Sequence, residues 1–552
     1  MLDWILLKEM PTDQHEVFET IRSKHKPDAL AHAKLAQTCR TAGRISEALE
    51  HQKIAVELAP HNGEYLANLA TLEITLGRVE EGIALARKAV EKEPDKASVH
   101  SSFLANLHYQ PEMNPQLLFE EHSRWGQIHA APEKATKSHP NDPDPDRRLR
   151  VGYISADFRR HPVAFFLEPL LDAHDRKSFE LYGYGNVVHP DGNTEQFGKK
   201  LDRYRNICGI EDRQVAHLIE QDRIDILVDL GGHTNDNRLT VLSYKPAPVQ
   251  VTYLGYFETT GIEQVDYFLT DELNSPPQSQ QFHTEQLVYL PDGFLCYKPP
   301  DCAPPVTQLP ATQKGHLTFG VFGNNRKINA FVLSLWAQTL KSCENSRLLL
   351  MFRGGQDWQL REHYLGQFER LAIARDRVEV RGHKPLAEYL KTYGEVDLIL
   401  DTYPYNGGTT TCNALWMGVP VLSLVGKHHM SRVGLSILSN LGMGLFAAST
   451  ADEFLAMIAS VSGNLESLAK IRASLRQRMA VSSLCDAGAL ADKIESAYKD
   501  MWRKWCRNHT AESRRAPQAS GRDGVLEFFI SKNSSLQFTV SKAGLPSFLL
   551  EA

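Results

Sequence analysis

The pattern of hydrophobic and polar positions changes along the chain near residue 148. Before this point, apolar residues recur at helical spacing, and a stretch that begins at Leu35 aligns without gaps with one that begins at Leu69. Gly43 aligns with Gly77 at the same distance of 34 residues. Because glycine often ends helices and a fixed period indicates stacked units, we predict helix–turn–helix repeats over residues 1–130.

After residue 148, short runs rich in β-branched and aromatic residues alternate with helical segments, which is typical of βαβ units. They predict two Rossmann-like halves at 149–310 and 311–506, whose ligands bind at the carboxyl ends of parallel strands. The expected strands lie at 148–156, 179–187, 224–232, 249–257, 317–323, 346–354, 378–382, 396–402 and 419–424.

Two segments do not fit either pattern. Residues 131–148 are rich in proline and charge and predict a linker. The Asp-x-Asp in this linker has no strand before it, so we interpret it as a solvated turn and not as a metal site. Residues 507–552 predict a flexible tail in which 525–531 and 536–541 could pair as a hairpin.

The composition favours a soluble protein. Hydrophobic residues make up 42% of the 552 residues, and the net charge of -6 argues against a general nucleic-acid binder. We find no apolar run long enough to span a membrane and no secretory signal. The eight cysteines form no C-x-x-C pair, as expected for reduced thiols and not for a zinc site. We therefore expect a cytoplasmic location and no membrane span.

The stretch 400–420, "LDTYPYNGGTTTCNALWMGVP", combines a predicted strand, a glycine turn and a helix start. Thr409, Thr410 and Thr411 would begin the helix. Free N–H groups at a helix start, together with threonine hydroxyls, suit a phosphate group. Ordinary helix capping by threonine is the alternative interpretation.

Lys327 follows the first strand of the same half, so it is expected at the same edge of the sheet. A lysine there can neutralise the charge that builds on a departing diphosphate. Asn324 could hydrogen-bond a base or a sugar. The alternative is a surface lysine in a loop.

Histidines follow two predicted strands of the first half. His161 stands before a proline, where it could accept a proton or hold a substrate, or be merely structural. Gly232 and His233 follow another strand, where the backbone could approach a sugar or an acceptor. A tight strand-to-helix turn is the alternative for this pair.

Several ordered blocks together resemble the catalytic region of the O-linked N-acetylglucosaminyltransferases. They include "VGYISADFRRHPV", "DILVDLGGHTNDNRL", "GVFGNNRKIN", "LDTYPYNGGTTTCNALWMGVPV" and "SRVGLSIL". The resemblance implies an α + α/β chain, with tetratricopeptide-type helical repeats ahead of a GT-B fold of two Rossmann-like domains. It also implies inverting transfer of a sugar from a UDP-sugar to a serine or threonine of a protein, with no metal or other cofactor. The partners would be the UDP-sugar and a protein or peptide acceptor, guided by the repeats.

Carried over by position, Lys327 matches the lysine at the donor diphosphate, and Asn324 matches a donor contact. Thr409 and Thr410 match the threonines of the phosphate-binding helix, and His161 matches the active-site histidine.

The chain also departs from this family. Asn413 stands where the family usually has an acid that binds the ribose hydroxyls, so a neutral hydrogen bond replaces a charge-assisted one. Phe257 and Glu258 replace a Pro-Gly pair, which puts bulk and charge near the expected sugar. Gly408 and Tyr389 stand where the animal enzymes carry histidine.

Three hypotheses follow. The first is transfer of N-acetylglucosamine from UDP-N-acetylglucosamine to protein serine or threonine. The second is a related UDP-hexose glycosyltransferase that acts on asparagine or on a non-protein acceptor. The third is a repeat-based interaction protein with a decayed transferase domain, against which the presence of Lys327, His161 and the threonine loop argues.

Overall fold

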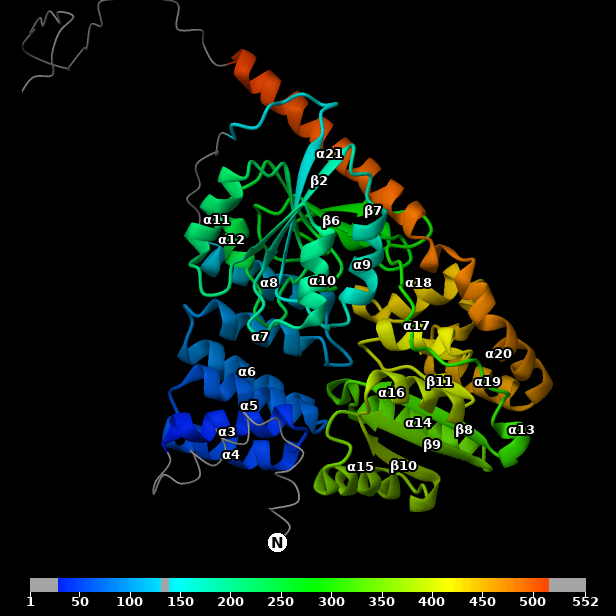
Figure 1. Cartoon of the computed structure of the whole chain (residues 1–552). Coiled ribbons are helices and arrows are strands. Elements are labelled where there is room, and N and C mark those ends of the chain that lie inside the picture. Colours follow the sequence, from blue (N-terminus) through cyan, green and yellow to red (C-terminus); the bar gives the residue numbers. More distant parts are fainter. Residues whose placement is uncertain (1–27, 131–138, 516–552) are drawn as a thin grey trace, which may run out of the picture. The chain divides into compact units, whose positions relative to one another are not determined.

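The computed structural model describes residues 28–130 and 139–515 (Figure 1). The first of these ranges is helical, as predicted, and the part of the predicted array before residue 28 lies outside the described residues. Gly43 and Gly77 have φ of 76° and 77° after α3 and α5, a left-handed conformation that glycine adopts at low cost and that turns each helix pair. The helices are α3 (Ala29–Thr41), α4 (Ile45–Leu58), α5 (Gly63–Thr75), α6 (Val79–Lys92), α7 (Ala97–Leu107) and α8 (Pro115–His129).

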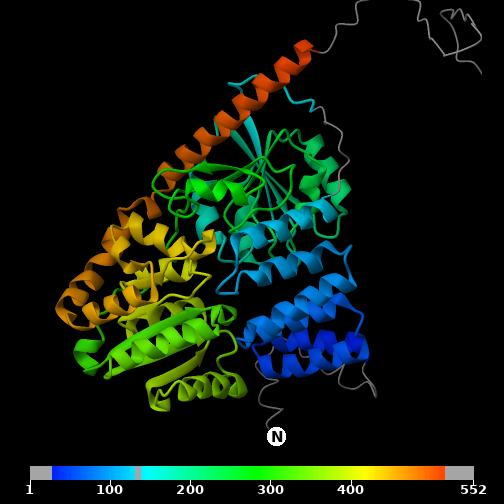
Figure 2. The ribbon, with the colours of Figure 1, turned by 180° about the vertical axis from the view of Figure 1, so that it is seen from behind.

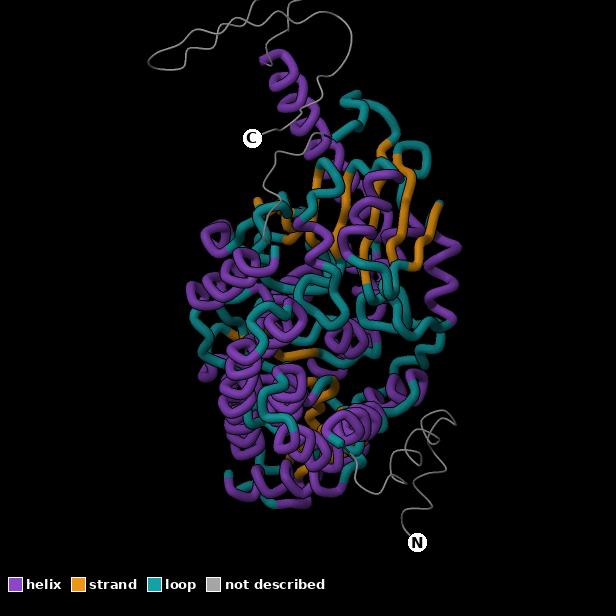
Figure 3. The backbone as a smooth tube through the Cα atoms, turned by 90° about the vertical axis from the view of Figure 1, so that its left-hand side faces the viewer, coloured by secondary structure: helices purple, strands orange, loops and turns teal. Residues whose placement is uncertain are grey.

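The first Rossmann-like half contains a seven-stranded sheet of order β3-β2-β1-β4-β5-β6-β7, in which every paired strand is parallel. Figure 3 shows these strands side by side. The strands are β1 (Leu149–Ser155), β2 (Phe179–Gly185), β3 (Arg203–Asn206), β4 (Ile226–Asp229), β5 (Val249–Thr252), β6 (Tyr267–Thr270) and β7 (Gln286–Tyr289). The helices are α9 (Ala164–Ala173), α10 (Gly192–Lys200), α11 (Asp212–Gln221), α12 (Leu239–Ser243) and the 3-10 helix η1 (Pro277–Phe282).

The second half contains a six-stranded parallel sheet of order β10-β9-β8-β11-β12-β13. The strands are β8 (Leu317–Gly323), β9 (Ser346–Phe352), β10 (Val378–Gly382), β11 (Leu398–Leu400), β12 (Val421–Leu424) and β13 (Ala447–Ala448). The α-helices are α13 (Ala311–Lys314), α14 (Ala330–Ser342), α15 (Trp358–Arg370), α16 (Leu386–Thr392), α17 (Thr409–Trp416), α18 (Val433–Asn440), α19 (Ala451–Ser462) and α20 (Leu465–Ala480). The 3-10 helices are η2 (Asn325–Lys327), η3 (Arg375–Arg377), η4 (Tyr393–Glu395), η5 (His429–Ser431), η6 (Gly444–Phe446) and η7 (Ser483–Cys485).

The central strands are buried on both faces, which is why they read as apolar runs and not as alternating patterns. Val151, Leu181 and Val228 in the first sheet are fully buried, and Leu350 and Val421 are fully buried in the second. All nine predicted strands are present. The chain therefore has the predicted architecture of helical repeats followed by a GT-B fold.

The last described helix, α21 (Ala487–Arg515), starts in the second half and packs against the first. Glu495 lies 2.8 Å from Nδ1 of His174, and the Trp502 indole donates to the Asp144 carbonyl at 2.9 Å. The helix continues past residue 507, the predicted start of a flexible tail, to Arg515, whereas the compact unit that contains both halves ends at Arg507. The predicted hairpin lies outside the described residues. No described helix is long and apolar enough to cross a membrane.

The repeat array contacts the first half through α7 and α8, which Figure 2 shows beside that sheet from behind. The Ser101 hydroxyl lies 3.0 Å from Nδ1 of His233, and Nε2 of His122 lies 2.8 Å from the Tyr256 hydroxyl. Gly126 also packs on Gly261, since a Cβ on Gly126 would meet the Gly261 carbonyl oxygen at 1.8 Å. The repeats and the first sheet thus share a tight, partly polar interface.

Candidate functional site

Lys327 lies at the carboxyl end of β8, in η2, as the pattern predicted. Its ammonium donates to the carbonyl oxygen of Asn406 at 2.7 Å and lies 4.0 Å from the ring centroid of Tyr405. Asn406 immediately precedes the glycines that lead into α17. The structure therefore places Lys327 beside the glycine–threonine loop, although the two segments are 79 residues apart.

Asp401, at the end of β11, fixes the shape of this loop. Its buried carboxylate accepts hydrogen bonds from the Gly407 N–H at 2.8 Å, the Thr402 N–H at 2.8 Å and the Ser423 hydroxyl at 2.7 Å. Burial raises the pKa of Asp401 to about 6, while these hydrogen bonds and Lys327 oppose the shift. The Asp401 carboxylate thus fixes the conformation of the loop before α17 through these three hydrogen bonds.

The first turn of α17 carries the three threonines. The Thr411 hydroxyl is buried and donates to the Gly407 carbonyl at 2.9 Å, so it caps the turn internally. Thr409 and Thr410 are partly exposed at the start of the helix. A helix start attracts anions because its N–H groups lack partners within the helix, and Thr409 and Thr410 add hydroxyl donors there.

Desolvation lowers the pKa of Lys327 to about 8; Asp401 opposes this shift and Arg326 adds to it. The ammonium is therefore charged at neutral pH but poorly solvated. An anion placed here would relieve that cost, as expected for a group that holds a diphosphate.

The two amides predicted for the donor lie differently. Asn324 is exposed, and its side chain accepts from the Arg326 N–H at 3.1 Å, so it caps η2. Asn413 is buried, and its Oδ1 accepts a hydrogen bond from the Tyr297 hydroxyl at 2.5 Å. Asn413 thereby joins α17 to a segment of the first half. The predicted donor contacts of both residues stay predictions.

His161 follows β1 and precedes α9, at the ligand-binding edge of the first sheet. Its Nδ1 lies 3.3 Å from Oδ2 of Asp157. Desolvation, followed by the charge of Arg159, lowers the pKa of His161 to about 4, and burial raises that of Asp157 to about 6. His161 is therefore an unprotonated imidazole at neutral pH. The sequence reasoning missed Asp157, although its position four residues before His161 was visible.

Gly232 and His233 lie in a closed environment. Gly232 has φ of 51°, and a Cβ there would meet Cβ of Tyr256 at 2.3 Å. His233 is buried, and its Nε2 lies 2.9 Å from the Thr260 carbonyl while its Nδ1 faces Ser101. This geometry supports the alternative of a tight turn for the pair, and the predicted role beside a sugar or acceptor stays a prediction.

Phe257 and Glu258 join both halves and the repeats. Phe257 stacks on His429 with ring centroids 5.1 Å apart, and Glu258 lies 3.5 Å from Nδ1 of His428. Burial opposes ionisation of Glu258, but His428 outweighs it and lowers the pKa of Glu258 to about 2. Nε2 of His428 lies 2.7 Å from the Met113 carbonyl. The charge introduced by Glu258 is thus neutralised inside the protein.

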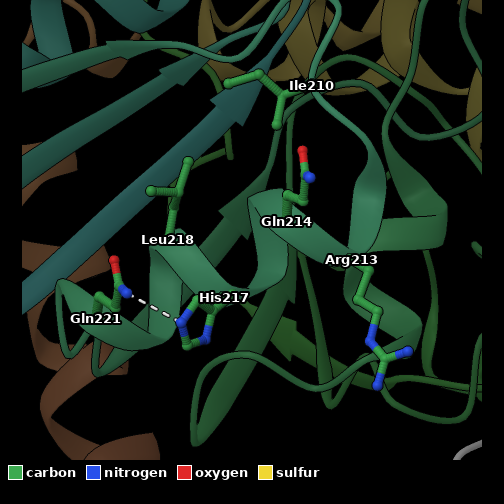
Figure 4. A pocket seen from close by; sticks show the side chains of 6 residues that line it. All are labelled: Ile210, Arg213, Gln214, His217, Leu218 and Gln221. Atoms are coloured by element: carbon green, nitrogen blue, oxygen red, sulfur yellow. Dashed lines mark hydrogen bonds between the residues drawn. The ribbon is translucent and has the colours of Figure 1, made fainter.

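A surface pocket lies elsewhere, along α11. Its lining includes Ile210, Arg213 and Leu218, and His217 lies 2.9 Å from Gln221 (Figure 4). None of the predicted site residues lines it. The strand-end site is therefore defined by its side chains and loops and not by this pocket.

Two Rossmann-like halves, with a lysine and a helix start at the strand ends of the second, are the arrangement of GT-B glycosyltransferases. The sequence profile of glycosyl transferase family 41 matches residues 124–298 and 308–494. The chain belongs to this family.

Similar proteins agree with this assignment. The solved structure of a Thermobaculum terrenum O-GlcNAc transferase mutant is 34% identical, with a TM-score of 0.85, covering 92% of this chain and 99% of that one. The probable UDP-N-acetylglucosamine–peptide N-acetylglucosaminyltransferase SPINDLY of Arabidopsis thaliana is 38% identical over 77% of this chain and 47% of its own length. The Caenorhabditis elegans UDP-N-acetylglucosamine–peptide N-acetylglucosaminyltransferase is 22% identical over 65% of this chain and 41% of its own length. The chain thus spans about half the length of these curated relatives.

Proposed function

We propose that this protein transfers N-acetylglucosamine from UDP-N-acetylglucosamine to serine or threonine hydroxyls of proteins. The observation that carries the proposal is the placement of Lys327 beside the loop that opens α17. The family and the names of its similar members support the choice of donor and acceptor. The proposal includes a cytoplasmic location and a protein or peptide acceptor guided by the repeats.

The reaction requires that the negative charge on the leaving diphosphate be stabilised and that the proton of the acceptor hydroxyl be removed. The acceptor oxygen attacks the anomeric carbon with inversion, the bond to the diphosphate breaks, and UDP leaves. Lys327 and the start of α17, with Thr409 and Thr410, would stabilise the negative charge on the leaving group. No metal ion is required in this scheme, because the lysine and the helix supply the positive potential.

The proton of the acceptor hydroxyl must also leave. His161 is unprotonated at neutral pH and lies at the strand ends of the first half, so it is the proposed acceptor or positioner of that proton. Asp157, at 3.3 Å, would orient its imidazole. Asn324 and Asn413 are proposed to contact the nucleotide sugar, in keeping with the family resemblance.

A second candidate is transfer of a different hexose from its UDP-sugar. The observation that favours it is the Phe257–His429 stack beside the Glu258–His428 pair, at the positions where the family resemblance implies a Pro-Gly pair near the sugar. Calorimetry and hydrolysis measurements with a panel of UDP-sugars distinguish the two candidates. Preference for UDP-N-acetylglucosamine supports the first, and preference for UDP-glucose or UDP-galactose supports the second.

A further inference from the structure

Two segments of the repeat array pack directly on loops of the second half. In the turn after α3, the Ala42 carbonyl accepts a hydrogen bond from the Gln356 amide at 3.4 Å. In α5, the Thr75 carbonyl accepts one from the buried Asn325 amide at 3.2 Å. These loops follow β9 and β8, so the repeats reach the same strand-end edge that holds Lys327.

Three arginines lie on or beside the elements that make these contacts. Arg40 lies in the last turn of α3, Arg353 follows β9, and Arg326 precedes Lys327 in η2. Desolvation, followed by the positive charges of Arg326 and Arg353, lowers the pKa of Arg40. The guanidinium of Arg326 also lies 5.2 Å from the ring centroid of Tyr109. The cluster therefore joins the repeats to the lysine loop.

Nearby acids do not neutralise this arginine cluster. In the part of the chain that the structure describes, none of the three guanidinium groups lies within ion-pair distance of an acidic side chain. Glu47 pairs with Arg44 instead. Arg353 is exposed, and Arg40 and Arg326 are half-buried. The Arg40 guanidinium also donates to the Gln37 side-chain oxygen at 2.9 Å and 3.1 Å, an uncharged partner that a carboxylate can replace.

The positive charge continues towards the first half. Desolvation, followed by the charges of Arg353 and Arg160, lowers the pKa of His383, which follows β10. Arg160 is exposed and directly precedes His161. His383 therefore lies within electrostatic range of both Arg353 of the cluster and Arg160 of the first half.

We propose that Arg40, Arg326 and Arg353 bind an acidic segment, rich in aspartate or glutamate, of the protein that accepts the sugar. This inference rests on the proposed function and names its substrate class. Arginine suits carboxylates because its planar guanidinium donates two parallel hydrogen bonds. The cluster lies between the repeats and Lys327, so a segment bound there stays close to the donor.

The test measures binding of two labelled peptides by fluorescence anisotropy. One contains a serine flanked by glutamates, and the other has glutamine in place of every glutamate. The variant is Arg40→Gln with Arg353→Gln, and the control is Arg347→Gln, because Arg347 is exposed at the amino end of the same strand β9. UDP affinity, measured in parallel, checks that each variant keeps its fold.

We expect the wild type to prefer the glutamate peptide. The double variant should bind it about three- to tenfold more weakly, the loss typical of two accessible ion pairs, and the control should not. The preference should shrink as salt is added. Equal binding of both peptides by the wild type, or an unchanged preference in the double variant, overturns the proposal.

Two further outcomes separate this proposal from binding of the donor and from failure of the proposed function. Displacement of the glutamate peptide by UDP alone would assign the cluster to the donor and would also overturn the proposal. If the proposed function fails, no sugar reaches any peptide, whereas arginine-dependent binding of the glutamate peptide is still observed and still supports the acidic-segment site.

Discussion

The ammonium nitrogen of Lys327 lies 2.7 Å from the carbonyl oxygen of Asn406. This hydrogen bond joins the loop after β8 to the loop that opens α17, where Thr409 and Thr410 are partly exposed. A cation and a helix start are thereby held at one edge of the second sheet. This edge is the predicted position of the UDP diphosphate.

Replacing Lys327 with methionine should lower the rate of transfer by about 10²- to 10³-fold, as loss of one group that stabilises transition-state charge typically does. UDP affinity should also fall. Steady-state kinetics and calorimetry measure the two effects. Lys341→Met, on the exposed surface of α14, is the control and should change neither quantity. Unchanged UDP affinity and rate in Lys327→Met would remove this lysine from the site.

Gly407 and Gly408 should respond differently to alanine. A Cβ at Gly407 would lie 2.4 Å from the Thr410 hydroxyl and 2.7 Å from the Thr411 hydroxyl, whereas one at Gly408 would meet nothing within 4 Å. Gly407→Ala should therefore destabilise the fold by about 1–3 kcal/mol, and Gly408→Ala should leave stability nearly unchanged. Thermal denaturation of the two variants checks the difference. Equal stabilities would show that the loop is not packed as described.

His161→Ala should lower transfer to a peptide by about 10²- to 10⁴-fold, the usual contribution of a general base, and should leave UDP binding nearly intact. Kinetics with a serine peptide and calorimetry with UDP separate these effects. Normal transfer by the variant would exclude His161 from the mechanism.

The interface between the repeats and the first half should weaken in acid. Burial lowers the pKa of His108 to about 3, and its Nε2 lies 3.1 Å from the Tyr256 hydroxyl. A lowered folded-state pKa gives stability that is present above the unfolded pKa of about 6.5 and is lost as pH falls towards the folded value. His108 alone accounts for a loss of about 2 kcal/mol between pH 7.5 and pH 5.

His108→Gln removes this titration and keeps a polar group near Tyr256. Denaturation measured at pH 7.5 and pH 5 should show a smaller acid-induced loss in the variant than in the wild type. Comparison with the wild type is needed because buried carboxylates with raised pKa values, such as Asp229 and Asp401, oppose the trend. Parallel losses in both proteins would show that His108 is accessible to protons in the folded state.

The hydrogen bond from the Asn325 amide to the Thr75 carbonyl should make donor binding depend on the repeats. Asn325→Ala leaves the Thr75 carbonyl without its amide partner and should destabilise the protein by about 1–3 kcal/mol and weaken UDP binding. Asn345→Ala is the control, since its amide bonds the Gly315 carbonyl at an exposed position. Deletion of residues 1–96 removes Thr75 as well, so it tests the fold of the site together with acceptor selection. Unchanged UDP affinity in Asn325→Ala would show that the repeats do not support the donor loops.

Much of this arrangement could be predicted from the sequence, because buried parallel strands are apolar runs and ligands lie at their carboxyl ends. Lys327 and His161 were placed correctly by that reasoning. The pattern did not predict β3, whose sequence "RYRN" is partly exposed at a sheet edge and carries no apolar run. It also missed the strands β6, β7 and β13.

Contacts between distant segments could not be predicted. Asn325 and Thr75 are 250 residues apart, and nothing in either local sequence indicates their hydrogen bond. His233 likewise follows a glycine pair in the manner of a ligand-binding residue, yet tertiary packing buries it against Ser101. The arginine cluster is also a product of packing, since its members come from three separate elements.

The central claim is best tested by mass spectrometry of a serine- and threonine-containing protein substrate after incubation with the purified enzyme, individual UDP-sugars and EDTA. The account predicts that UDP-N-acetylglucosamine gives N-acetylglucosamine on serine or threonine, that EDTA does not prevent it, and that Lys327→Met nearly abolishes it. Transfer of a different sugar only, transfer that requires added manganese, or no transfer from any UDP-sugar would contradict the account.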